Sequence, residues 1–134
     1  MTIHSTVLSG HGVLDDIGYL VSNKQKVLFV SDKNIMRIAG VQALLAKIQS
    51  QAKQVLVIDD IPPEPSDLDV LAITDKFDLR GAEFVIGVGG GSVLDVAKLL
   101  SALAHNESPT LDELLAGTKV TQRVKSLMVP TTAG

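Results

Sequence analysis

Four short apolar runs, none longer than six residues, recur along the chain and constrain its fold more than any other feature. Runs that are short and have no polar alternation are typical of strands buried on both faces of a parallel sheet. Between them, apolar residues recur at helical spacing. The repeated order of strand and helix predicts a doubly wound α/β domain with a mainly parallel sheet and right-handed crossovers. The four runs are residues 26–30, 54–58, 83–88 and 126–129.

Helices are predicted between these strands, and one further strand is predicted at the start of the chain, over residues 3–8. Pro62, Pro63 and Pro65 exclude a helix or a central strand from their segment, because proline has no backbone donor. Ser66-Asp67 should then cap a helix that turns Leu68, Leu71, Ala72 and Phe77 inward. The other helices are expected over residues 14–21, over residues 35–48 with a break near Gly40, over residues 93–105, and briefly from Thr110.

Composition excludes several classes of protein. The 134 residues fit one domain, and the absence of cysteine excludes disulfides and thiolate metal sites. A net charge of −3, with no basic stripe, argues against nucleic acid as a partner. No apolar run reaches the ~20 residues of a membrane span, and the start of the chain lacks a signal-peptide pattern. We therefore expect a cytoplasmic, soluble protein without a metal site, since the histidines are scattered at His4, His11 and His105.

The strongest local motif is Gly89-Gly90-Gly91-Ser92, where the third buried run passes into a helix. Glycines there let a ligand approach the backbone, and the helix start offers free N–H groups to an anion. The alternative is a plain turn with small residues for packing. The run is neither the usual dinucleotide fingerprint, because Ser92 takes the place of its third glycine, nor a P-loop. It predicts a site for the phosphate of a nucleotide or coenzyme.

Polar residues near the same sheet edge are further candidates, each with a structural alternative. Asp32 follows a strand and could accept the hydroxyls of a ribose, or it could cap the next helix. Lys98 could reach a phosphate and Asp95 could accept from a ribose or a bound water, or the two could form a solvated ion pair within the helix. Thr131 and Thr132 could bind phosphate or the nicotinamide amide, or they could cap a turn.

Together, the motifs resemble the iron-containing (group III) alcohol dehydrogenase family. The resemblance rests mainly on Gly-Gly-Gly-Ser-x-x-Asp-x-Ala-Lys at residues 89–98 and on Val-Pro-Thr-Thr-Ala-Gly at residues 129–134. It extends over essentially the whole chain, although Glu64 stands where the family commonly has Asn. The supporting segments are Gly10-x-Gly12, Val30-Ser31-Asp32-Lys33, Pro63-Glu64-Pro65 and the lead-in at residues 81–86.

This resemblance implies a Rossmann-like nucleotide-binding domain of the kind that also begins dehydroquinate synthase. It implies NAD as coenzyme, with NADP less favoured, and an alcohol or aldehyde as substrate. A homodimer is the assembly that this resemblance suggests. By motif position Asp32 would bind the adenosine ribose, and Gly90, Gly91 and Ser92 the pyrophosphate. Thr131 and Thr132 would lie beside the phosphates and the nicotinamide, while Asp95 and Lys98 would line the same cleft.

In this family a second, helical domain supplies one Asp and three His ligands to a divalent metal, iron or zinc. We therefore interpret residues 1–134 as the dinucleotide-binding domain alone, inactive without that second domain. Two alternatives stay open: a stand-alone module that binds a dinucleotide without catalysis, and a related polyol dehydrogenase or synthase of the same fold. Ser92 and the Thr-Thr-Ala-Gly end weigh against the last.

Overall fold

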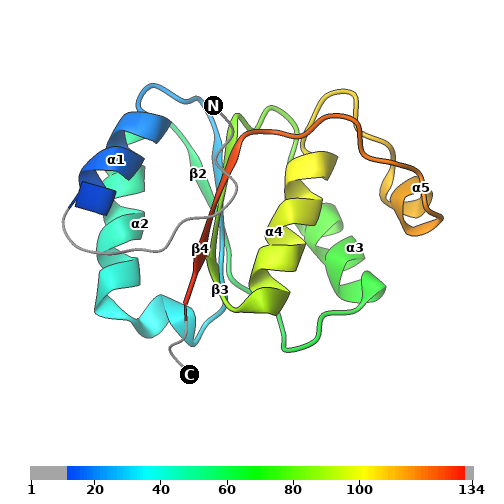
Figure 1. The fold of residues 1–134 in the computed structure, drawn as a ribbon, viewed down its shortest axis with the longest axis horizontal. Helices are drawn as coiled ribbons and strands as arrows, with labels where there is room; N and C mark the ends of the chain where they lie inside the picture. Colours follow the sequence, from blue (N-terminus) through cyan, green and yellow to red (C-terminus); the bar gives the residue numbers. More distant parts are fainter. Residues whose placement is uncertain (1–11, 132–134) are drawn as a thin grey trace.

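A computed structural model describes residues 12–131, with side-chain burial from Asp16 onward. The strand expected over residues 3–8 and the threonine Thr132 lie outside this range. The described elements form a sheet of four strands surrounded by helices (Figure 1). The strands are β1 (Val27–Val30), β2 (Val55–Ile58), β3 (Phe84–Gly89) and β4 (Ser126–Pro130). The helices are α1 (Gly12–Val21), η1 (Ile35–Arg37), α2 (Ala39–Gln51), α3 (Asp67–Lys76), α4 (Gly91–Leu103) and α5 (Leu111–Leu115).

The sheet is parallel throughout, and its strand order is β2-β1-β3-β4. Figure 1 shows α1 and α2 on one face and α3 and α4 on the other. The prediction of a doubly wound, parallel α/β fold is therefore confirmed. The direction in which successive strands are added to the sheet changes at β1. From β1 the chain adds β2 on one side, and it then crosses to the other side of β1 to add β3. Such a reversal leaves a crevice beyond the carboxyl ends of the two central strands.

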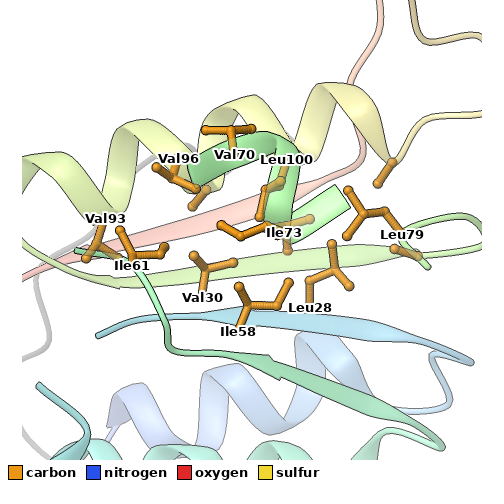
Figure 2. Packing of buried hydrophobic residues seen from close by; sticks show 14 of the residues in the cluster. Leu28, Val30, Ile58, Ile61, Val70, Ile73, Leu79, Val93, Val96 and Leu100 are labelled. Carbon is orange, nitrogen blue, oxygen red and sulfur yellow. The ribbon is translucent and has the colours of Figure 1, made fainter. Parts of the chain in front are cut away.

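Aliphatic side chains of the two central strands alternate between the faces of the sheet and build a core on each side. Leu28 and Val30 of β1 lie in the core under α3 and α4 (Figure 2). Val85 of β3 belongs to the same cluster. Phe29 and Ile86 face the core under α1 and α2. All residues of β1 and β3 are buried, as the unbroken apolar runs predict. The edge strand β2 is less covered than expected, because only Ile58 is fully buried.

The helix expected to break near Gly40 breaks earlier. A short 3-10 turn, η1, ends at Arg37, and α2 begins at Ala39, so Gly40 lies inside α2. The extended backbone of Ile38, with ψ 127°, separates the two. The break follows from local hydrogen bonding, since the amide of Ile35 donates to the side chain of Asp32 and starts a turn of its own.

The inward face predicted for α3 is wrong. Leu68 and Leu71 are 75% and 42% exposed, while Val70 and Ile73 are buried. Figure 2 shows Val70 and Ile73 in the same cluster as α4. Ala72 is exposed as well, and Phe77, just past the helix, packs partly buried against the cluster. The predicted start of α3 is confirmed, because Ser66 forms a capping box there. Capping defines where a helix begins but not which of two apolar stripes faces the sheet.

Two substitutions in α3 test this assignment of faces. Ile73→Ala removes a buried side chain and should lower the free energy of unfolding by about 2–4 kcal/mol. Leu68→Ala is the matched control, and because that side chain is exposed, its effect should stay within about 0.5 kcal/mol. Urea unfolding followed by circular dichroism measures both. A larger loss in Leu68→Ala than in Ile73→Ala would mean that the helix is rotated as the sequence suggested.

Candidate functional site

A pocket of about 500 Å³ lies at the carboxyl edge of the sheet, where the chain leaves β1 and β3 for opposite faces. Three segments far apart in the sequence line it, each immediately following a strand. Their convergence is expected, because parallel strands deliver their following loops to one edge. The lining residues are Asp32, Lys33 and Asn34 after β1, residues 59–63 after β2, and Gly90, Gly91, Ser92 and Val93 after β3.

The start of α4 forms one wall of this pocket. Gly90 is the N-cap residue and makes no side-chain capping bond, and the first turn contains no acidic residue. The first bond of the helix runs from the amide of Leu94 to the carbonyl of Gly90. The amides before Leu94 therefore have no partner within the helix, and the positive end of its dipole faces the pocket. This wall is suited to an anionic group.

The glycines around this wall divide into two kinds. A Cβ at Gly87 would lie 2.7 Å from Cβ of Ala97, and one at Gly89 would lie 2.9 Å from Cβ of Val93. These two glycines are needed for the close packing of α4 on β3. A Cβ at Gly90 or Gly91, by contrast, would meet nothing within 4 Å.

The backbone of Gly90 does not require glycine either. Its φ of −81° and ψ of −174° are accessible to any residue. Neither packing nor conformation within the described chain therefore accounts for glycine at this position. Its effect is to leave the pocket wall open to a group that approaches the backbone.

Asp32 is half-buried and lines the pocket, and its side chain also contacts the start of η1. Its Oδ1 accepts a hydrogen bond of 2.8 Å from the amide of Ile35. A hydrogen bond of the capping kind is thus present, although the N-cap residue of η1 is Asn34, and the interpretation of Asp32 as a ribose acceptor stays a prediction, to which the pocket position adds support. A backbone bridge to Asp60 ties the segment after β1 to the segment after β2.

Lys33 joins the same two segments through ion pairs that the sequence did not suggest. Its Nζ lies 3.1 Å from Oδ1 of Asp59 and 3.2 Å from Oδ1 of Asp60. Oδ2 of Asp60 also lies 2.9 Å from Nζ of Lys76, in the last turn of α3. Hydrogen bonds to Asp59 and Asp60 raise the pKa of Lys33, and hydrogen bonds from Lys76 and Lys33 lower the pKa of Asp60. The position of the two aspartates just after β2, the argument used for Asp32, could have identified them.

Thr131 lies beside the glycine run, because its amide donates to the carbonyl of Gly89 at 3.0 Å. Its Oγ1 is buried and has no hydrogen-bond partner within residues 12–131. A buried hydroxyl without a partner costs about 1–3 kcal/mol, so a partner for Oγ1 is expected there. Thr131 is not among the residues that line the pocket itself.

Asp95 and Lys98 are both exposed on α4, and neither lines the pocket. In the part of the chain that the structure describes, no ion pair joins them. The structure thus brings together Asp32, Gly90, Gly91 and Ser92, with Gly89 directly adjoining through β3. It leaves Asp95 and Lys98 outside that group.

Two further properties concern the described residues alone. They contain no group of three or more His, Cys, Asp or Glu residues that could hold a metal ion. None of the helices within residues 12–131 is both long and apolar enough to cross a membrane.

Residues 4–134 match the family model described as iron-containing alcohol dehydrogenase. Among curated proteins, a similar sequence is long-chain-alcohol dehydrogenase 1 of Geobacillus thermodenitrificans, 33% identical over 93% of this chain and 33% of its own length. The chain thus spans about a third of the length of the curated relatives it matches.

Solved structures agree in fold. The iron-containing alcohol dehydrogenase of Thermotoga maritima is 25% identical, with a TM-score of 0.78 over 98% of this chain and 37% of that one. The sulfoacetaldehyde reductase of Bifidobacterium kashiwanohense, solved in complex with NAD⁺, is 21% identical, with a TM-score of 0.69 over 100% of this chain and 35% of that one.

The packing role of Gly87 can be tested by adding a single methyl group. Gly87→Ala should lower the free energy of unfolding by about 1–3 kcal/mol, because the new Cβ would overlap Ala97 and press on Met128. Gly40→Ala is the matched control: its Cβ meets nothing within 4 Å, and alanine in a helix should add about 0.4–1 kcal/mol. Thermal and urea unfolding give both values. Equal stability of the two variants would show that α4 does not depend on Gly87.

Proposed function

The chain belongs to the iron-containing alcohol dehydrogenase family, and from this premise we propose that it binds NAD in the pocket at the carboxyl edge of its sheet. In this proposal it is the nucleotide-binding part of an enzyme that oxidises alcohols or reduces aldehydes. The observation that carries the proposal is Gly90. Its lack of a side chain is explained neither by packing nor by backbone conformation, and it opens the pocket wall at an uncapped helix start.

The residues present fit a dinucleotide at three points. The amides at the start of α4, with the hydroxyl of Ser92, provide donors for the pyrophosphate. Oγ1 of Thr131, buried and without a partner among residues 12–131, lies outside the pocket lining but next to this loop, where a coenzyme bound along the loop would supply a partner. Asp32, across the same pocket, would accept hydroxyl donors from the adenosine ribose. The NAD⁺ complex of the structurally similar sulfoacetaldehyde reductase supports the choice of coenzyme.

The chemistry is divided between this chain and the rest of such an enzyme. When bound, NAD accepts or delivers hydride, and in this family a divalent metal, iron or zinc, polarises the oxygen of the alcohol or aldehyde. The residues described here bind and orient: the start of α4 fixes the phosphates, and Asp32 fixes the ribose. We place the metal ligands and the substrate pocket in a second domain of the kind that the family resemblance implies. Assembly as a homodimer and a cytoplasmic location stay predictions from the sequence.

Substitution of Gly90 tests the coenzyme site directly. The protein should bind NADH, and Gly90→Val should weaken binding at least about tenfold, since its side chain would fill the space next to the amides. The fold should survive, because the backbone of Gly90 accepts any residue and its Cβ meets nothing. Calorimetric titration measures affinity, and circular dichroism checks the fold.

Gly90→Ala and Gly40→Ala form a matched pair of the same chemical change, one inside the pocket and one remote from it. Only the first should weaken NADH binding. Unchanged affinity in Gly90→Val would refute the assignment of this loop to the pyrophosphate.

The preference for NAD over NADP should depend on the charge of Asp32. Asp32→Asn is the informative change, because asparagine can still accept from the amide of Ile35 but carries no charge to repel a 2′-phosphate. The ratio of the dissociation constants for NADPH and NADH should fall by roughly tenfold, or ~1.4 kcal/mol. A ratio that does not move would leave Asp32 with its capping role alone.

A further inference from the structure

Within the described part of the chain, Lys33 is the one cation among the residues that line the pocket. It directly follows Asp32, so its ammonium is within reach of whatever Asp32 binds. A free lysine at this position would favour NADP, because an ammonium attracts the phosphate that distinguishes NADP from NAD.

The structure does not leave this ammonium free. Nζ of Lys33 lies 3.1 Å from a carboxylate oxygen of Asp59 and 3.2 Å from one of Asp60. These two aspartates line the same pocket from the segment that follows β2. Asp60 forms a second ion pair, because its other carboxylate oxygen lies 2.9 Å from Nζ of Lys76. Asp60 therefore engages two lysines at once, and Asp59 engages one.

The charges of this group favour an uncharged ribose. Asp32, Asp59 and Asp60 carry three negative charges, and Lys33 and Lys76 carry two positive ones. The two lysines are matched by Asp59 and Asp60, which leaves the carboxylate of Asp32 as the net charge. A phosphate group, with a charge of about −1.5 to −2 at neutral pH, would meet a negative rim at which the described residues offer no available cation.

We propose that Asp59 and Asp60 are specificity residues that select NAD by holding the ammonium of Lys33 away from the 2′ position of the coenzyme. This inference rests on the proposed function, because it assumes that the dinucleotide occupies this pocket. In this proposal the preference for NAD over NADP depends on Asp59 and Asp60, in the loop after β2, as well as on the carboxylate of Asp32. It also gives Lys76, outside the pocket lining, a positioning role through Asp60.

The test is the double variant Asp59→Asn/Asp60→Asn. Both side chains keep their size, while both carboxylate partners of Lys33 lose their charge. Calorimetric titration of the protein with NADH and NADPH at low salt should show the ratio of dissociation constants, NADPH over NADH, falling by roughly fivefold or more. The change should shrink when salt is added, because salt screens exposed charges. Asp60→Asn alone should move the ratio in the same direction and serves as the test if the double variant does not fold.

Two further variants separate the release of Lys33 from a general change in charge. Asp78→Asn removes one charge from an exposed ion pair with Arg80, outside the pocket, and should leave the ratio unchanged. Lys33→Met added to the double variant should cancel the gain in NADPH affinity. If the gain survives Lys33→Met, or if Asp78→Asn produces it equally, the inference is overturned.

The experiment also distinguishes this inference from the proposed function. Wild-type protein that binds neither coenzyme would refute the proposed function, and this inference with it. Wild-type protein that prefers NADH, together with an unchanged ratio in a folded double variant, would overturn the role of Asp59 and Asp60 alone.

Discussion

The parallel pairing of β1 with β3 is the interaction on which the rest of the structure depends. Val30, the last residue of β1, stands opposite Gly87, so β3 continues past the end of β1 to Gly89. The buried hydroxyl of Ser31 donates to the carbonyl of Val88 at 2.8 Å. The chain then leaves the two strands for opposite faces of the sheet. Two loops that diverge in this way cannot fill the edge between them, and a pocket remains.

Small residues make that edge a surface suited to an anion. Because Gly87 has no side chain, Ala97 of α4 can lie close against β3, and the start of α4 is held at the carboxyl edge. The same helix therefore contributes its apolar side to the core and its first amides to the pocket. Gly90 and Gly91 add nothing to the packing of this helix, and they keep its first turn accessible. One continuous motif thus serves two different physical purposes.

The opposite wall of the pocket is organised by charge. One carboxylate oxygen of Asp32 accepts a hydrogen bond from the amide of Ile35 in η1. The backbone of Asp32 bridges to Asp60, so the segment after β1 is tied to the segment after β2. Lys33 strengthens the same junction through Asp59 and Asp60. Single exposed ion pairs contribute little to stability. The main effect of these ion pairs is to fix the position of the Lys33 ammonium beside Asp59 and Asp60.

Local signals allowed much of this protein to be predicted from its sequence: the four apolar runs, the glycine run at a helix start, the cap at Ser66 and the position of Asp32 after β1. Each depends on neighbours within a few positions, which spacing and composition record. The tertiary structure alone decided that Val70 and Ile73, rather than Leu68 and Leu71, face the core, because both stripes of α3 are apolar and only packing against α4 chooses between them. It also decided that Gly87 and Gly90 have different purposes, and that Lys33 meets Asp59, 26 residues away. Those outcomes depend on which atoms the fold brings together across long separations in the chain, and no local pattern carries that information.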